Sequence, residues 1–205
     1  MPRTKEQNEE IKEKTLLKIR ETGLKLFSYK GLAATSTSDI AKEAGVSSGL
    51  MYHYYRSKED LYADLVGFAV RESNNSFRQV LKMPVRPLEK IIFLTKSILE
   101  DLEKNDQISQ YFLLVTQALL NTDLPENART YMDEVYVTFD IMKEMIIDGQ
   151  RSGEIGKGDP EMLTTLYLSS IKGICTYKLI LGERFIVPPV ENMISLLSPI
   201  KKYET

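Results

Sequence analysis

The sequence predicts an all-α fold of about nine helices, with a three-helix head at the N-terminus and a larger helical body. Two observations support this prediction. Apolar residues recur at intervals of three and four over most of the 205 residues, which is the period of one face of an α-helix. Residues that start or stop helices, such as Ser36, Gly31 and Pro160, stand between these apolar segments, so each segment can be bounded as a separate helix.

The composition is that of an ordinary folded protein. Hydrophobic residues make up 42% and charged residues 27% of the chain, and its length allows one large domain or two small ones. The charged N-terminus lacks the apolar run of a signal peptide, and no segment approaches the ~18 consecutive apolar residues that span a bilayer. We therefore expect a cytoplasmic protein with no membrane partner.

The chain offers little material for a metal site or a catalytic centre. It contains one cysteine, Cys175, and one histidine, His53, which excludes an internal disulfide and disfavours a Cys/His zinc site. No motif brings together a nucleophile, a general base and a group that orients the base. We expect no enzymatic activity, no metal and no cofactor.

The first predicted helix covers residues 9–30. Its apolar side repeats every three or four residues, and Gly31 ends it because glycine readily adopts the left-handed conformation found after many helices. The residues on that side are Leu16, Ile19, Gly23, Leu26 and Phe27.

Two short helices follow, joined by a tight turn. Ser36 is expected to cap the second helix, with Asp39 completing a capping box in its first turn. Gly45 suits the turn because it can take a positive φ. Ser47 then caps a third helix that runs to Tyr55. This layout is a helix-turn-helix, whose third helix is free to enter the major groove of DNA.

Helical geometry divides the third helix into two faces. Val46, Met51 and Tyr55 face the second helix and are predicted to be core. The opposite face carries small, hydroxylated and aromatic residues, which is unusual where only solubility matters and suits a surface pressed on DNA. That face consists of Ser48, Gly49, Tyr52 and His53. Core packing, the alternative for an aromatic cluster, fits Tyr55 better than Tyr52 or His53.

Charge is distributed unevenly along the chain. Residues 1–58 contain eleven Lys and Arg against seven Asp and Glu, a net charge of +4. Because the whole chain has a net charge of −2, the remaining residues carry −6. Only a module that faces phosphates needs positive potential. The asymmetry indicates a basic DNA-binding module on an acidic body, although uneven solvated faces would produce it equally well.

The segment "TSTSDIAKEAGVSSGLMYHYYRSKEDL", residues 35–61, resembles the DNA-binding signature of the TetR family of bacterial transcription regulators. The preceding "LKIRETGLKLFSYKG" is similar to the first helix of that family. The resemblance covers roughly the first 65 residues. It implies an all-helical homodimer in which each subunit has a three-helix DNA-binding head and a larger helical body that holds a small effector.

Carried over position by position, the resemblance implies roles in DNA binding for individual residues. Residues near the edges of bases are Ser38, Ser48, Gly49, Leu50 and Tyr52. Residues at phosphates are Ser36, Thr37, His53 or Tyr54, and Lys58. Leu50 stands where the family usually has a small or hydroxylated residue, and Ser38 and Ser48 stand where longer polar or basic side chains are common. Base reading is therefore expected to use apolar contact with thymine methyl groups.

A long fourth helix, about residues 58–81, is expected to run from the head into the body and to end before Pro84 and Pro87. We assign residues 1–57 to a helix-turn-helix DNA-binding domain. Residues 58–205 are assigned to a helical effector-binding and dimerisation domain.

Three amphipathic segments follow, over residues 88–104, 106–121 and 127–151, and all three are predicted to be core helices. The last of them carries a regular apolar stripe, which predicts one continuous helix. The stripe consists of Ala128, Tyr131, Val135, Phe139, Met142 and Ile146.

The helix predicted over Pro160–Leu181 has two apolar faces about 120° apart. Two such faces require two burial partners, of which one is the core of the domain and the other a second subunit. The candidates for a dimer interface are Leu163, Leu166, Ser170, Ile174, Tyr177 and Leu181. The other face consists of Thr164, Leu168, Ile171, Cys175 and Leu179. With residues 190–198, this helix lies where the resembled family forms its four-helix dimer interface.

These observations favour a transcription repressor that binds a palindromic operator in double-stranded DNA as a homodimer and is released by a small-molecule effector. A DNA-bound architectural or adaptor protein without a small ligand stays open, and an enzyme is the weakest alternative. Aromatic residues of the body are candidates for lining the effector pocket, although each fits a plain helical core equally well. They are Tyr111, Phe112, Tyr131, Phe139 and Tyr167.

Overall fold

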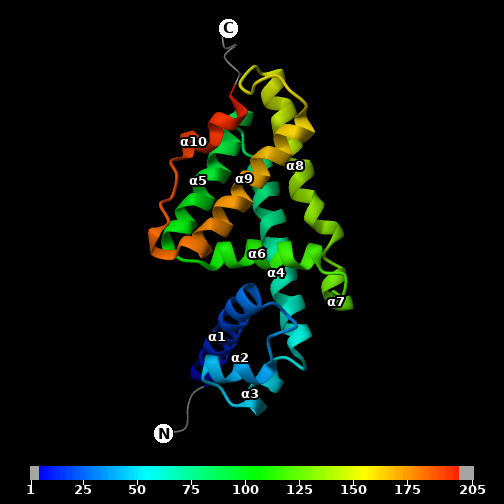
Figure 1. Cartoon of the computed structure of the whole chain (residues 1–205), viewed down its shortest axis with the longest axis vertical. Coiled ribbons are helices and arrows are strands. Elements are labelled where there is room, and N and C mark those ends of the chain that lie inside the picture. The colour runs from blue at the N-terminus through cyan, green and yellow to red at the C-terminus, as the bar shows by residue number, and fades with distance from the viewer. Residues whose placement is uncertain (1–4, 199–205) are drawn as a thin grey trace.

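The computed structural model describes residues 5–198 and confirms the all-α fold (Figure 1). Within those residues it contains ten α-helices, three short 3-10 helices and no strand. The α-helices are α1 (Lys5–Lys30), α2 (Thr37–Ala44), α3 (Ser48–Tyr54), α4 (Lys58–Leu81), α5 (Pro87–Lys104), α6 (Gln107–Leu120), α7 (Glu126–Arg129), α8 (Tyr136–Arg151), α9 (Pro160–Leu181) and α10 (Val190–Ile194). The 3-10 helices are η1 (Asp133–Val135), η2 (Gly182–Arg184) and η3 (Ser195–Leu197). No helix within residues 5–198 is long and apolar enough to cross a membrane.

The molecule is elongated, with α1–α3 at one end and the helices from α5 onwards at the other (Figure 1). Helix α4 runs from the head into the body, and it begins and ends at the predicted residues. Helix α6 lies across the base of the body and packs against both α1 and α4. The body therefore meets the head through two helices rather than through α4 alone.

Local hydrogen bonds set the ends of the two short head helices. The Ser36 hydroxyl accepts from the backbone N–H of Asp39 at 3.0 Å, and the Asp39 carboxylate accepts from the backbone N–H of Ser36 at 3.2 Å. The predicted capping box is thus present. Gly45 has a φ of 66°, the left-handed conformation that the turn between α2 and α3 requires. The Ser47 hydroxyl accepts from the backbone N–H of Leu50 and caps α3.

Two hydrophobic cores hold the chain together. The first is centred in the head but also contains Leu114 and Ala118 of α6 and Ala128 of α7. The second is built from the C-terminal part of α4 together with α5, α8, α9 and α10. Because residues of α6 and α7 complete the first core, head and body share buried surface, and a shift of α6 disturbs packing on the head side as well.

The prediction of one continuous helix over residues 127–151 is wrong in its first part. The chain instead forms the end of α7, a turn, η1 and then α8. Ala128 is buried in the first core and Met142 in the second, and the chain between them turns. Tyr131 packs on α4 at Gly67, where an added Cβ would lie 2.5 Å from Cζ of the tyrosine. The absence of a side chain at Gly67 therefore lets the turn approach α4.

Candidate DNA-binding surface and effector cavity

Helix α3 presents the predicted base-facing residues to solvent. Met51 is fully buried in the first core, which fixes the orientation of the helix. Tyr52 is 55% exposed, and Ser48, Gly49 and Leu50 are exposed with it. A helix-turn-helix whose third helix has one buried and one exposed face has the shape that enters a major groove.

Helix α2 begins with polar residues beside this surface. Ser36 and Ser38 are exposed, and Thr37 is half-buried. The Ser36 hydroxyl donates to Oδ2 of Asp39 at 2.6 Å, so its proton is used inside the cap. Hydrogen bonds from the Ser36 hydroxyl and backbone N–H lower the pKa of the Asp39 carboxyl, which keeps a negative charge at the start of α2, where the helix dipole favours it.

His53 and Tyr54 end α3 in different surroundings. His53 is exposed, and its ring meets the Tyr54 ring edge to face at 5.5 Å between centroids. Tyr54 is half-buried, and its hydroxyl donates to the carbonyl oxygen of Lys12 on α1 at 3.2 Å. Tyr54 thus holds α3 against α1, and His53 is the more accessible of the two.

Lys58 does not lie as a free charge. Its Nζ atom donates to the carbonyl oxygens of Leu32 at 2.8 Å, Ala33 at 3.4 Å and Thr35 at 2.8 Å. An ammonium has three N–H donors, and all three are engaged with the turn between α1 and α2. These hydrogen bonds tie the start of α4 to that turn, which argues against the predicted phosphate contact of Lys58.

Asp64 on α4 joins three helices at the junction of head and body. Its Oδ2 atom accepts from Nη1 of Arg20 on α1 at 2.5 Å and from the hydroxyl of Tyr55, just after α3, at 2.7 Å. Burial, and after it the hydrogen bond to Asp64, raises the pKa of Tyr55. The hydroxyl therefore stays protonated and keeps donating, so the end of α3 is held to α4.

Arg20 also begins a chain of contacts that reaches the body. The guanidinium carbon of Arg20 lies 4.9 Å from the ring centroid of Phe68 on α4. The Phe68 ring is in turn 5.5 Å, between centroids, from the ring of Tyr111 on α6. Both rings line a cavity in the body. Contacts therefore run without a break from the end of α3 to the wall of that cavity.

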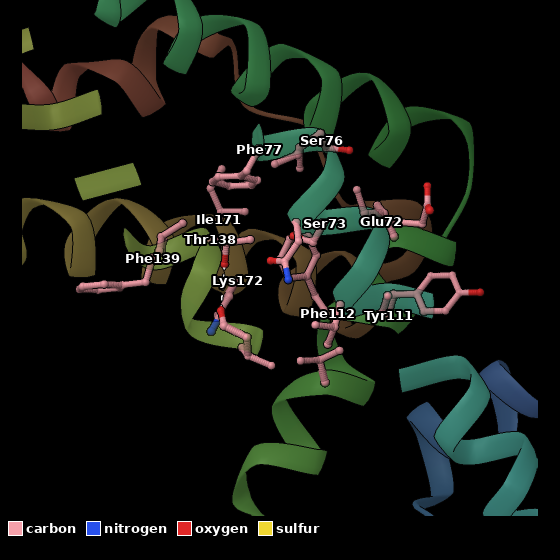
Figure 2. Close-up of a pocket in the computed structure, with 18 of the residues that line it drawn as sticks. Glu72, Ser73, Ser76, Phe77, Tyr111, Phe112, Thr138, Phe139, Ile171 and Lys172 are labelled. Carbon is pink, nitrogen blue, oxygen red and sulfur yellow. Dashed lines mark hydrogen bonds between the residues drawn. The ribbon is translucent and has the colours of Figure 1, made fainter. Parts of the chain in front are cut away.

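The cavity has a volume of about 450 Å³ and lies among α4, α5, α6, α8 and α9 (Figure 2). This volume is typical of sites for small molecules. Four predicted pocket residues line it, namely Tyr111, Phe112, Phe139 and Tyr167. The structure places Tyr131 elsewhere, in contact with the first core and with the guanidinium carbon of Arg71 5.2 Å from its ring centroid.

The interior of the cavity is mostly apolar and its charged groups lie at the margin. In Figure 2 the Glu72 carboxylate and the Tyr111 hydroxyl point away from the other labelled side chains. Glu72 and Lys172 are exposed. Tyr167 is almost fully buried; its hydroxyl shares a 2.6 Å hydrogen bond with Oγ1 of Thr95, and burial raises its pKa to about 12. The cavity therefore suits a mainly apolar molecule.

Asn74 on α4 is a lining residue that sequence reasoning missed. It is 1% exposed, its Nδ2 atom donates to the carbonyl oxygen of Glu134 at 3.0 Å, and its Oδ1 atom has no hydrogen-bond partner among the described residues. A signal was present in the sequence. Asn74 falls between Val70 and Phe77, four and three residues away on the buried side of α4, and a polar residue on an apolar stripe marks a position with a special role.

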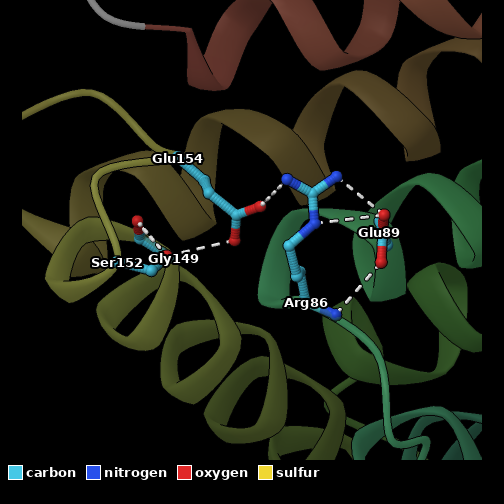
Figure 3. Close-up of polar contacts among 5 residues, drawn as sticks. All are labelled: Arg86, Glu89, Gly149, Ser152 and Glu154. Atoms are coloured by element: carbon cyan, nitrogen blue, oxygen red, sulfur yellow. Dashed lines mark hydrogen bonds and ion pairs between the residues drawn. The ribbon is translucent and has the colours of Figure 1, made fainter.

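Polar contacts fix the end of the body where α5 begins and α8 ends (Figure 3). Arg86 Nη2 donates to Oε1 of Glu89 at 2.7 Å, and Arg86 Nη1 lies 3.3 Å from Oε1 of Glu154. The Ser152 hydroxyl donates to the other oxygen of Glu154 at 3.0 Å. Arg86 is largely exposed, so these ion pairs add little to stability. Their effect is to join the start of α5 to the turn after α8.

Helix α9 buries one of its apolar faces and exposes much of the other. Thr164, Tyr167, Ile171 and Cys175 are its buried residues. Of the predicted dimer residues, three are exposed (Leu166, Tyr177, Leu181) and three are half-buried (Leu163, Ser170, Ile174). Met162 and Ile180 are exposed beside them and were not predicted. The exposed apolar stripe of α9 is defined here as Met162, Leu166, Tyr177, Ile180 and Leu181.

The described residues contain no group of three or more His, Cys, Asp or Glu side chains able to hold a metal ion. Burial raises the pKa of the Cys175 thiol to about 12, and a buried thiol is a poor nucleophile.

Known proteins resemble the head most clearly. Residues 19–65 match the family model described as "Bacterial regulatory proteins, tetR family". The HTH-type transcriptional repressor KstR2 of Mycolicibacterium smegmatis is 30% identical over 129 residues, which cover 60% of this chain and 61% of that protein. The chain spans between 40% and 61% of the length of the first curated relatives that it matches.

Solved structures share the fold over most of the chain. The transcriptional regulator FadR from Bacillus subtilis, solved in complex with stearoyl-CoA, has a TM-score of 0.67 at 21% identity, covering 91% of this chain and 100% of that one. The MbdR regulator from Azoarcus sp. CIB has a TM-score of 0.76 at 16% identity, covering 91% and 99%. At these identities the likeness shows the fold alone. Residues 19–65 therefore carry the helix-turn-helix of the TetR family of bacterial regulatory proteins, and the solved structures share the fold of head and body.

Proposed function

We propose that the protein is a transcription repressor that binds a palindromic operator as a homodimer and leaves it when a small, mainly apolar molecule occupies the cavity. The observation that carries the proposal is the continuous set of contacts from Tyr55 through Asp64, Arg20 and Phe68 to the cavity wall. A ligand there can act on the end of α3. The relative KstR2 is a transcriptional repressor, which supports repression rather than activation.

On DNA, the exposed face of α3 lies in the major groove. Tyr52 and Ser48 offer hydroxyls to base edges, Leu50 offers apolar contact to thymine methyl groups, and Gly49 lets the backbone approach closely. Thr37 and His53 flank this face and contact phosphates. Support comes from the exposure of all four α3 residues beside a buried Met51.

The homodimer forms through the exposed apolar stripe of α9. Leu166 is 53% and Ile180 66% exposed, and a stripe of such residues on one helix is stabilised when a second copy covers it across a two-fold axis. Two-fold symmetry explains why the operator is palindromic. It places one α3 helix in each of two major grooves about 34 Å, or a multiple of that distance, apart.

The effector enters the cavity and shifts α4 and α6, which carry Phe68 and Tyr111. A structural neighbour, FadR from Bacillus subtilis, was solved in complex with stearoyl-CoA. An apolar interior of about 450 Å³ is compatible with an aliphatic chain or a compact ring system in this protein. The ligand binds the shifted arrangement more tightly than the DNA-binding arrangement, so its binding lowers the affinity for DNA. A ligand moves such an equilibrium only by its differential affinity for the two states.

The DNA-binding part is tested by selecting duplexes from a random pool with the purified protein. The selected sites are expected to contain an inverted repeat. Inserting five base pairs between the half-sites rotates one by about half a turn, so affinity should fall steeply. Unchanged affinity contradicts binding as a two-fold dimer.

The effector part is tested by melting the protein with a library of small apolar compounds, because a ligand of the native state raises the melting temperature. Compounds that raise it are expected to weaken operator binding. If no compound does so, or if the stabilising compounds leave operator affinity unchanged, an architectural or adaptor protein becomes the better description.

A further inference from the structure

The amide of Asn74 is held in one orientation. The carbonyl oxygen of Glu134 can only accept a hydrogen bond, so the Asn74 atom 3.0 Å from it must be the NH₂ group. The carbonyl oxygen, Oδ1, therefore faces the other way. It has no partner among the described residues, although it is buried. The free atom is thus an acceptor, and its orientation is fixed by the backbone of η1.

A buried acceptor without a partner is destabilising and rare, and it calls for a physical explanation. Among the described residues only two buried side-chain atoms are in this state, Asn74 Oδ1 and Ser109 Oγ. Of the two residues, Asn74 alone lines the cavity. A leucine at position 74 would continue the apolar stripe of α4 without leaving an acceptor unpaired.

Other polar groups of the cavity have partners, lie at its margin or, like Ser73, are only half-buried. The hydroxyls of Thr116 and Thr138 donate to the backbone carbonyls of Phe112 and Val135. The Tyr167 hydroxyl is bonded to Thr95. Asn74 therefore offers the one buried, unpaired hydrogen-bonding atom among the described residues that line the cavity.

We propose that Asn74 Oδ1 receives a hydrogen bond from the effector, so the effector is an uncharged, mainly apolar molecule that carries an O–H or N–H donor. This inference rests on the proposed effector function of the cavity. A carboxylate has no donor and would place a negative charge against a carbonyl oxygen. An ammonium has donors, but the two carboxylates that line the cavity, Glu72 and Asp101, lie at its exposed margin. An ammonium at Asn74 would therefore leave water for an apolar interior without a counter-ion beside it, which is costly.

The experiment uses two isomeric probes, decanol and nonyl methyl ether, which have the same number of heavy atoms and differ in the hydroxyl donor. Their affinities are measured by displacement of a fluorescent apolar dye from the full-length protein. The alcohol is expected to bind about five- to tenfold more tightly than the ether, the effect of one net hydrogen bond. Equal affinities for the wild-type protein overturn the assignment.

Two matched variants locate the effect. Asn74→Leu removes the acceptor. It is expected to abolish the preference for the alcohol, while binding of the ether is retained. Asn75→Leu makes the same change at the next residue of α4, which is exposed, and is expected to keep the preference. Circular dichroism checks that both variants are folded. If Asn74→Leu does not fold, the wild-type preference decides the chemistry of the ligand. A preference that survives in a folded Asn74→Leu protein overturns the role of Asn74.

The same titrations separate this inference from the proposed function. If both probes bind equally and both weaken operator binding, the cavity is an effector site and the Asn74 assignment falls. If neither probe displaces the dye or alters operator affinity, the cavity is not a site for such molecules, and the inference falls together with the effector part of the proposed function.

Discussion

At the scale of single residues, exposure and hydrogen bonding divide α3 and its flanks into residues that position the helix and residues available to DNA. Met51 is buried, Tyr54 is bonded to α1 and Tyr55 to α4. Tyr52 stands among these residues with more than half of its side chain exposed. An exposed tyrosine adds little to stability, so its effect on DNA binding can be measured without unfolding the head.

Tyr52→Ala should weaken binding to the operator more than binding to random duplex DNA. A base-edge contact carries ~1–3 kcal/mol of discrimination, so the ratio of specific to non-specific affinity should fall. Fluorescence anisotropy with both duplexes measures that ratio. Tyr29→Ala removes a similarly exposed ring from α1 and serves as the control. Equal losses on both duplexes would exclude Tyr52 from the base-reading surface.

Lys58→Ala should lower the stability of the head rather than the salt dependence of DNA binding. The change leaves three carbonyl oxygens of the α1–α2 turn without their donor, and hydrogen bonds to a charged group are each worth about 1.5–3 kcal/mol in favourable cases. The melting temperature should therefore fall, while Lys42→Ala, an exposed lysine on α2, should leave it unchanged. An unchanged melting temperature with a salt slope reduced by about one would restore Lys58 as a phosphate contact.

At the scale of helices, α6 contacts both the cavity and the head. It lines the cavity with Tyr111 and Phe112. It also holds α1, because Gln117 Nε2 donates to the carbonyl oxygen of Ser28 at 3.0 Å and Gln107 Nε2 donates to Glu21 at 3.1 Å. A movement of α6 would therefore reach the head through α1 as well as through α4.

Tyr55→Phe should weaken the coupling between effector and operator while each still binds alone. The variant loses the hydrogen bond from α3 to Asp64 and keeps the ring in the first core. The factor by which effector lowers operator affinity is the measured quantity. Tyr62→Phe makes the same change at a buried tyrosine of α4 whose ring packs on Phe27, and should leave the factor unchanged. An unaltered factor in Tyr55→Phe would show that coupling does not run through Asp64.

Leu166→Asp should convert the proposed dimer to monomers, because it places a charge in the exposed apolar stripe of α9 that the second copy would cover. Sedimentation velocity measures the change in mass, and operator affinity should fall with it because one head binds only one half-site. Leu120→Asp on α6, where the leucine is even more exposed, is the control. A monomeric wild-type protein, or a Leu166→Asp variant that stays dimeric, would contradict this interface.

At the scale of the whole molecule, any coupling between the proposed effector site and the proposed operator site must be reciprocal. If the effector weakens operator binding by some factor, the operator must weaken effector binding by the same factor, typically ~5–150-fold through a coupling of ~1–3 kcal/mol. Titrating the effector into free protein and into protein saturated with operator measures both values. Identical effector affinities in the two titrations would exclude release of DNA by that ligand.

The sequence by itself determined the features that depend on short-range order. The bounds of α4 and α9, the capping box at Ser36 and the turn at Gly45 were predicted because their hydrogen bonds lie within about four residues. The exposed face of α3 followed from helical periodicity and from the family resemblance. Four aromatic residues of the cavity wall were also predicted as pocket residues, although the sequence fits a plain helical core equally well at those positions.

Only the tertiary structure decided the features that depend on partners far along the chain. The acceptors that engage Lys58 lie 23 to 26 residues away. The predicted helix over residues 127–151 is interrupted near Tyr131, which packs on Gly67 of α4. The free acceptor of Asn74 arose from a donor bond to Glu134, 60 residues away. Periodicity shows which side of a helix is buried. It does not show which residues that side packs against. Those residues decide whether a buried polar atom is hydrogen-bonded within the protein or left free for a ligand.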